Sequence, residues 1–148
     1  MTLPQWALNR WLTKQAPDPK AIRELLELVD RDLPDSRQTG LSADRRLSCA
    51  YTAALQAAAA ALCAEGYRTT GGGSHHFYAI QSLAHTIGAE GSLIRQVDDL
   101  RRKRNTAEYS RAGLVSEAQA RQAVEIAERV RDAVVKWLRE KHPDLVIP

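Results

Sequence analysis

The chain has 148 residues, of which 44% are hydrophobic and 26% charged, and it carries a formal net charge of +3. These values are typical of one globular domain and exclude a disordered chain. No run approaches the ~20 consecutive apolar residues of a membrane span, and the first residues lack the layout of a secretory signal. We therefore expect a single cytoplasmic domain over residues 1–148 with no membrane contact.

Helical periodicity dominates the chain and strand patterns are almost absent, which predicts an all-α fold. Residues 1–15 are expected to hold a short amphipathic helix. Asp18 followed by Pro19 is typical of a helix start, as N-cap and first helical residue. The helix that begins there should run to about residue 33, because Pro34 is expected to end it.

A long helix is predicted from the N-cap residue Ser42 to about Glu65, with Gly66 as its C-terminal glycine. Its expected core face consists of Leu47, Tyr51, Ala54, Ala58, Ala61 and Leu62. The many alanines predict a neighbouring helix that approaches closely, because their side chains leave little bulk between the two axes.

Residues 69–74 contain three consecutive glycines and are predicted to form a flexible loop. The loop lacks the lysine and the following serine of the Walker motif of phosphate-binding loops, and no strand is expected before it. A helix over residues 75–87 should follow, and then another over residues 92–109.

The last long helix is expected to begin after Ser116, which forms a capping box with Gln119, and to end near Lys141. Residues 142–148 would then form a tail. The predicted architecture is an antiparallel up-down bundle of four main helices plus the short N-terminal helix.

One arginine interrupts an apolar line on the helix expected over residues 92–109. At helical spacing this line consists of Leu93, Val97, Leu100, Arg104 and Ala107. A guanidinium that faces the core needs a partner or a cleft, since burying it alone is costly. Arg104 could pair with Glu108 or with a carboxylate of another helix, or it could bind phosphate in a groove, including one shared with a second copy of the chain.

Positive charge is concentrated on the same helix. Between Arg95 and Arg111 there are six basic and three acidic residues, including the run Arg101-Arg102-Lys103-Arg104. Such a run is often a solvated helix face, and the alternative is a surface for a phosphate-rich partner such as RNA.

The segment Arg104-Asn105-Thr106-Ala107-Glu108-Tyr109 resembles the signature of HEPN domains, in which an arginine and a polar residue shortly precede a histidine. The alanine-rich helix, the Gly-Ser-His loop and the capped last helix extend the likeness over roughly residues 41–138. The resemblance implies a small all-α bundle that is often a two-fold homodimer. Many HEPN proteins are metal-independent endoribonucleases of toxin, defence or RNA-processing systems, and an antitoxin or nucleotidyltransferase would be the protein partner expected of a toxin–antitoxin pair.

Tyr109 stands where the family's histidine is expected. A tyrosine has a pKa of about 10 and is a poor base at neutral pH, although it can donate a hydrogen bond or stack on a base. RNA supplies its own nucleophile, the 2′-OH, so cleavage needs a proton acceptor and a cation for the phosphate. By resemblance, Arg104 and Asn105 are the phosphate-facing candidates and Tyr109 occupies the remaining catalytic position.

His75 and His76 are secondary candidates for that acid–base role. They lie in the first turn of a predicted helix, where the helix dipole favours the neutral ring. His76 aligns with the apolar residues of this helix, which predicts a partly buried side chain. Neither histidine has a third ligand at helical spacing, so no metal site and no cofactor are predicted.

These observations favour a dimeric HEPN-like protein that binds RNA or a protein partner through Arg101, Arg102, Lys103 and Arg104, with weak or absent ribonuclease activity. One alternative is an active metal-independent endoribonuclease of a toxin–antitoxin or defence system with a non-standard acid or base. The other is a helical bundle that interacts only with proteins.

Overall fold

The computed structural model describes residues 1–109 and 113–146, and the side chains of all of these except residues 107–109. Its helices are α1 (Leu3–Leu8), α2 (Pro19–Ser36), α3 (Ala43–Ala64), α4 (His75–Gln81), α5 (Gly91–Tyr109) and α6 (Glu117–Lys141). Two 3₁₀ turns (Ser82–Ala84 and Pro143–Leu145) and two short strands, β1 (Leu12–Lys14) and β2 (Tyr67–Thr69), complete the described part of the chain.

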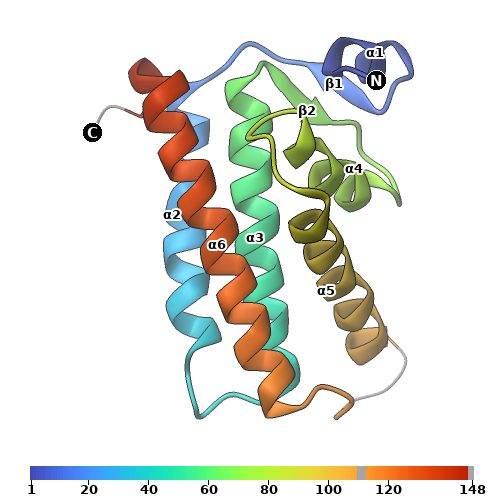
Figure 1. The fold of residues 1–148 in the computed structure, drawn as a ribbon, viewed down its shortest axis with the longest axis vertical. Coiled ribbons are helices and arrows are strands. Elements are labelled where there is room, and N and C mark those ends of the chain that lie inside the picture. The colour runs from blue at the N-terminus through green and yellow to red at the C-terminus, as the bar shows by residue number, and fades with distance from the viewer. Residues whose placement is uncertain (110–112, 147–148) are drawn as a thin grey trace.

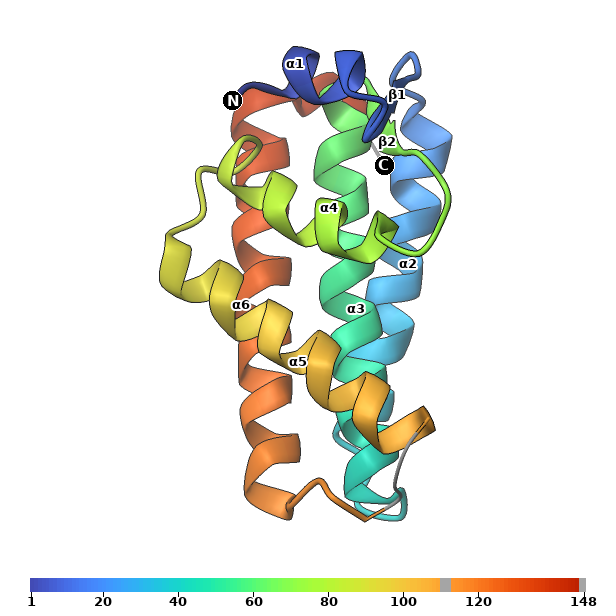
Figure 2. The same cartoon turned by 90° about the vertical axis from the view of Figure 1, so that its right-hand side faces the viewer.

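The four main helices α2, α3, α5 and α6 alternate in direction along the chain, as the colour order in Figure 1 shows. The all-α up-down bundle predicted from the sequence is therefore confirmed. Helix α3 is central and packs against α2, α5 and α6. Helices α4 and α5 cross one face of the bundle at an inclination to α3 and α6 (Figure 2).

Helix α3 supplies most of the core. All six residues predicted for its core face are buried, with exposed fractions of 0–1%. By length and composition α3 could cross a membrane, but 67% of its most apolar window is buried within the bundle. This burial is typical of a core helix.

The predicted helix starts are confirmed by their hydrogen bonds. The Asp18 carboxylate accepts from the Lys20 amide at 3.0 Å, and Ser42 Oγ accepts from the Arg45 amide at 3.2 Å. Ser116 and Gln119 form the expected reciprocal capping box. Side-chain oxygens of this kind satisfy amides that the first helical turn leaves without a backbone acceptor.

The expected end of α2 at Pro34 is wrong, because the helix continues to Ser36. A proline in the last turn removes only one backbone donor, and the turn still closes when the Arg37 amide donates to the Pro34 carbonyl at 3.1 Å. Ser36 is fully buried, and its hydroxyl donates to the Leu33 carbonyl at 2.6 Å.

The two short strands were not predicted. They form an antiparallel ribbon in which Leu12 lies opposite Thr69, so residues 12–14 are extended and α1 is only six residues long. A three-residue strand is too short for a recognisable alternation. Burial of Leu12 in a cluster with Trp6 and Leu62 holds the ribbon against the C-terminal end of α3, where Leu62 lies. Strand β2 also precedes the glycine loop, contrary to the sequence-based expectation.

The helix expected over residues 75–87 is shorter than predicted. Helix α4 ends at Gln81 and a 3₁₀ turn follows. The Ser82 hydroxyl donates to the Ala79 carbonyl at 2.7 Å, and the Thr86 hydroxyl donates to the Ser82 carbonyl at 3.3 Å. Hydroxyl groups that bond back to the main chain compete with the α-helical pattern.

Candidate functional site

The candidate site is built around Tyr51, a fully buried residue of α3 that lies beneath α4 and α5. Its hydroxyl is 3.0 Å from Nδ1 of His76, which comes from the first turn of α4. From α5, the guanidinium carbon of Arg104 lies 5.6 Å from the centre of the Tyr51 ring, within the range of a cation–π contact. Three helices thus bring an arginine, a histidine and a tyrosine into one cluster.

His76 is half-buried, as its alignment with apolar residues predicts. Burial is the main cause that lowers the pKa of His76 below its usual value, and repulsion from His75, Arg104 and Arg101 adds to it. Both effects disfavour the charged ring. The imidazole is therefore neutral at pH 7 and retains one nitrogen that can accept a proton.

Tyr51 keeps its proton over the whole physiological range, because burial raises its pKa to about 12 despite the opposing charges of Arg104 and Arg101. A protonated phenol can donate to Nδ1 of His76 or accept from an Nδ1–H group. In the second arrangement the other ring nitrogen, Nε2, carries the free lone pair. Tyr51 therefore orients the His76 ring in either tautomer.

Arg104 faces the bundle, as its position on the apolar line predicts. The preceding residues of that line, Val97 and Leu100, are 0% and 2% exposed, and Arg104 itself is half-buried. The predicted alternative partner Glu108 has a side chain outside the described residues. The contact with Tyr51 gives this guanidinium an aromatic neighbour on α3.

The basic run is partly compensated by acidic side chains on its own helix. Arg101 and Arg102 both donate to the buried carboxylate of Asp98 at 2.8 Å. Arg102 also lies 3.7 Å from the carboxylate of Asp99. Arg101 in addition lies over the exposed ring of Phe77, 5.9 Å from its centre. Two of the four predicted phosphate contacts are thus engaged in ion pairs within α5.

Among the remaining predicted site residues, Lys103 and Asn105 are half-buried on α5. The side chain of Tyr109 lies outside the described residues. Of the secondary candidates, His75 is half-buried with its ring centre 4.3 Å from that of His76. The structure therefore brings His76 to Arg104 over Tyr51 and places His75 beside His76.

Sequence reasoning assigned Tyr51 only to the core and so missed its place between His76 and Arg104. The missing information was the inclination of α4 and α5 over α3, which no local pattern encodes. One available indication was the hydroxyl itself, since a buried tyrosine hydroxyl usually has a hydrogen-bond partner.

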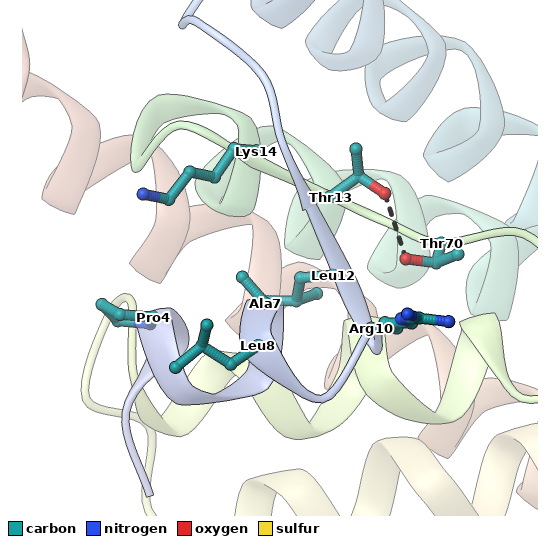
Figure 3. A pocket seen from close by; sticks show the side chains of 8 residues that line it. All are labelled: Pro4, Ala7, Leu8, Arg10, Leu12, Thr13, Lys14 and Thr70. Atoms are coloured by element: carbon teal, nitrogen blue, oxygen red, sulfur yellow. Dashed lines mark hydrogen bonds between the residues drawn. The ribbon is translucent and has the colours of Figure 1, made fainter.

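A surface hollow of about 620 Å³ lies away from this cluster, beside α1 and β1. Its lining is mainly apolar, and Figure 3 shows Lys14 and Arg10 extending in opposite directions at its border. The two cations do not converge on one anion. Nothing in this hollow suggests catalytic chemistry.

Among the residues that the structure describes, no three His, Cys, Asp or Glu side chains are grouped so that they could hold a metal ion. No protein-family model and no curated protein sequence matches the chain.

Proposed function

We propose that this protein is a HEPN-like domain that binds RNA through a surface of helices α4 and α5, here called the α4–α5 face, which consists of His75, His76, Arg101, Arg102, Lys103 and Arg104. The observation that carries the proposal is the cluster in which Arg104 and His76 meet over Tyr51. An arginine can donate to two phosphate oxygens at once, and a neutral histidine can hydrogen-bond to a 2′-OH. We further propose a cytoplasmic location.

The electrostatics of α5 support binding of an anion despite the ion pairs at Asp98. Arg101 and Arg102 together are balanced by Asp98 and Asp99, and Lys103 adds a further positive charge on this stretch. A phosphate that approaches this surface can also share the exposed donors of Arg102, whose side chain is 68% exposed. The proposal therefore expects binding that depends strongly on salt.

Replacing Arg101, Arg102 and Lys103 together with alanine is expected to weaken RNA binding, because it removes three cations and leaves Asp98 uncompensated near the RNA. The logarithm of the affinity should fall less steeply with the logarithm of the salt concentration, by about 0.7 for each lost phosphate contact on single strands. Fluorescence anisotropy with labelled RNA at several salt concentrations measures both quantities.

The matched control is the triple change Lys136→Ala, Arg139→Ala and Lys141→Ala on α6, which removes the same charge from exposed positions. It should leave the affinity and the salt slope near the wild-type values. Equal losses of RNA affinity in the two triple variants would show that RNA binds by general charge attraction and not at the α4–α5 face. No RNA binding by the wild-type protein would leave the third hypothesis, a bundle that interacts only with proteins.

A second candidate function is metal-independent RNA cleavage, as in a toxin or defence nuclease, and the hydrogen bond between Tyr51 and His76 favours it. When Nδ1–H donates to Tyr51, Nε2 of His76 can take the proton of a 2′-OH. The 2′-oxygen then bonds to the adjacent phosphorus, the bond from phosphorus to the 5′-oxygen breaks, and that oxygen takes a proton from solvent. Arg104 would balance the charge on the phosphate. His76 would then act as the base in place of the HEPN signature histidine, whose position Tyr109 occupies in this sequence.

We also propose that the protein is a two-fold homodimer whose α5 helices approach each other. The supporting feature is the position of Arg104, a half-buried guanidinium on the apolar line of α5, which a subunit interface accommodates more easily than a lone bundle does. Trp6 gives no support to the dimer, because this side chain is only 7% exposed and packs within its own chain. In a toxin–antitoxin system the further partner would be an antitoxin or a nucleotidyltransferase.

Sedimentation equilibrium is expected to give the mass of a dimer at tens of micromolar protein. A change at the proposed contact, Thr106→Arg, should shift the equilibrium toward monomer, because Thr106 is exposed near the end of α5 and like charges would then meet across the axis. The exposed position Arg121 on α6 serves as a control through Arg121→Glu. A wild-type monomer at these concentrations would contradict the dimer.

A further inference from the structure

A small pocket lies beside the α4–α5 face, between the β-ribbon and the start of α4. It measures about 210 Å³ and is lined by Arg10, Trp11, His75, Tyr78 and the glycine run 71–73. This volume is below the range of drug-sized ligand sites and suits one planar ring. The lining combines aromatic surface with a cation, which are the two features that single-strand binding proteins present to nucleotides.

The aromatic side of the pocket is a rigid stack. The rings of Trp11 and Tyr78 are nearly parallel, at 15°, with centres 5.0 Å apart. Both rings contact the buried side chain of Trp6 edge-on at 5.8 Å. Trp11 and Tyr78 are themselves half-buried, so part of each ring stays accessible. A preorganised ring of this kind loses little side-chain freedom when a base stacks on it.

The backbone also fixes Trp11. Its amide donates to the Trp6 carbonyl at 3.0 Å, and its carbonyl accepts from the Thr70 amide at 3.2 Å. The preceding residue, Arg10, has a φ of 64°, a left-handed conformation that residues other than glycine rarely adopt. This strained turn places the Arg10 side chain at the border of the pocket. Strained residues of this type concentrate at binding sites.

The pocket is continuous with the α4–α5 face through the two histidines. His75 lines the pocket, and its ring centre is 4.3 Å from that of His76. The His76 ring lies 5.9 Å from Tyr51, over which Arg104 lies at 5.6 Å. A single strand that contacts Arg104 with one of its phosphates could therefore place one of its bases against Trp11.

We infer that this pocket binds one nucleobase of a single-stranded RNA whose phosphates contact the α4–α5 face. The inference rests on the proposed function and narrows its substrate class to strands with unpaired bases. A duplex keeps its bases stacked inside the helix and cannot offer one to the Trp11–Tyr78 stack. Arg10 would contact the phosphate or the edge of the bound nucleotide.

The first test uses the wild-type protein with two labelled strands of about 12 nucleotides, a length within the site sizes of single-strand binding modules. One is oligoadenylate RNA and the other is an abasic strand of equal length and charge. The abasic strand is expected to bind about tenfold more weakly, because it keeps the phosphate contacts but has no base to stack on Trp11. Equal affinities would overturn the base pocket and leave phosphate binding intact. An oligoadenylate that binds no better than an RNA duplex of equal length would overturn the single-strand class.

The second test is the variant Trp11→Leu. Its affinity for oligoadenylate should be about tenfold lower than that of the wild type, and its affinity for the abasic strand should be unchanged. Its salt slope should equal that of the wild type, since no charge is removed. Trp11→Phe keeps an aromatic ring and should recover part of the affinity. The control is Trp137→Leu, which alters a half-buried tryptophan of α6, and circular dichroism checks that each variant folds. Unchanged oligoadenylate affinity in folded Trp11→Leu would overturn the inference, whereas failure of the wild type to bind either strand would overturn the proposed function itself.

Discussion

Replacing His76 with glutamine is expected to slow the proposed metal-independent RNA cleavage by about 10²- to 10⁴-fold, the usual contribution of a positioned general base. Glutamine can keep a hydrogen bond to the Tyr51 hydroxyl but cannot take a proton at neutral pH. The fold should be preserved, because His76 is only half-buried. Cleavage of labelled RNA in the presence of a chelator, followed on denaturing gels, measures the rate.

Two controls restrict the interpretation of that result. His85→Gln changes an exposed histidine that is not part of the Tyr51 cluster, and it should leave the rate unchanged. A strand of the same sequence with 2′-deoxyribose should not be cut by any variant, because it lacks the nucleophile. If the wild-type protein cuts no RNA, the nuclease candidate fails and the binding proposal stands. If the His76→Gln variant still cuts RNA, the general base is a residue other than His76, and Tyr109 is the other candidate that the sequence offers.

The pH dependence follows from the lowered pKa of His76. A general base acts in its neutral form, so the rate should rise with pH and reach its plateau below the pH expected for an ordinary histidine. Arg104 is one of the charges that lower this pKa. Arg104→Ala should therefore move the rise to higher pH as well as lower the rate. A profile centred near pH 10 would instead indicate a tyrosine base.

Replacing Ala57 with leucine is expected to lower the free energy of unfolding by about 1–3 kcal/mol, the typical cost of an oversized side chain in a packed core. Ala57 is fully buried on α3, the helix that packs against both α2 and α6. The added carbons have no space unless a neighbouring helix moves. Urea unfolding measures the effect as a lower midpoint at an unchanged m-value.

The matched control is Ala59→Leu on the same helix. Ala59 is only partly buried, and leucine and alanine have similar helix propensities, so the loss should be much smaller. Equal losses at the two positions would show that the cost comes from the helix itself. An unchanged midpoint for Ala57→Leu would contradict the close approach of helices that the alanines predict.

The sequence by itself determined the features that depend on neighbouring residues. Helix starts at Asp18, Ser42 and Ser116 need only a side chain that reaches an amide two or three residues away, and all three are present. The core faces follow from helical spacing, so the buried line on α3 and the inward direction of Arg104 were both predictable. The all-α class follows from the same periodicity.

Only the tertiary structure decided which side chains meet. Tyr51 and His76 are 25 residues apart in the chain, and their hydrogen bond depends on how α4 lies across α3. The β-ribbon likewise forms because Leu12 finds a buried position beside Trp6 and Leu62, which no three-residue pattern predicts. Local energies select helices and caps, whereas the inclination of one helix over another is set by packing along the whole length of both. The cluster of Tyr51, His76 and Arg104 is a product of that packing.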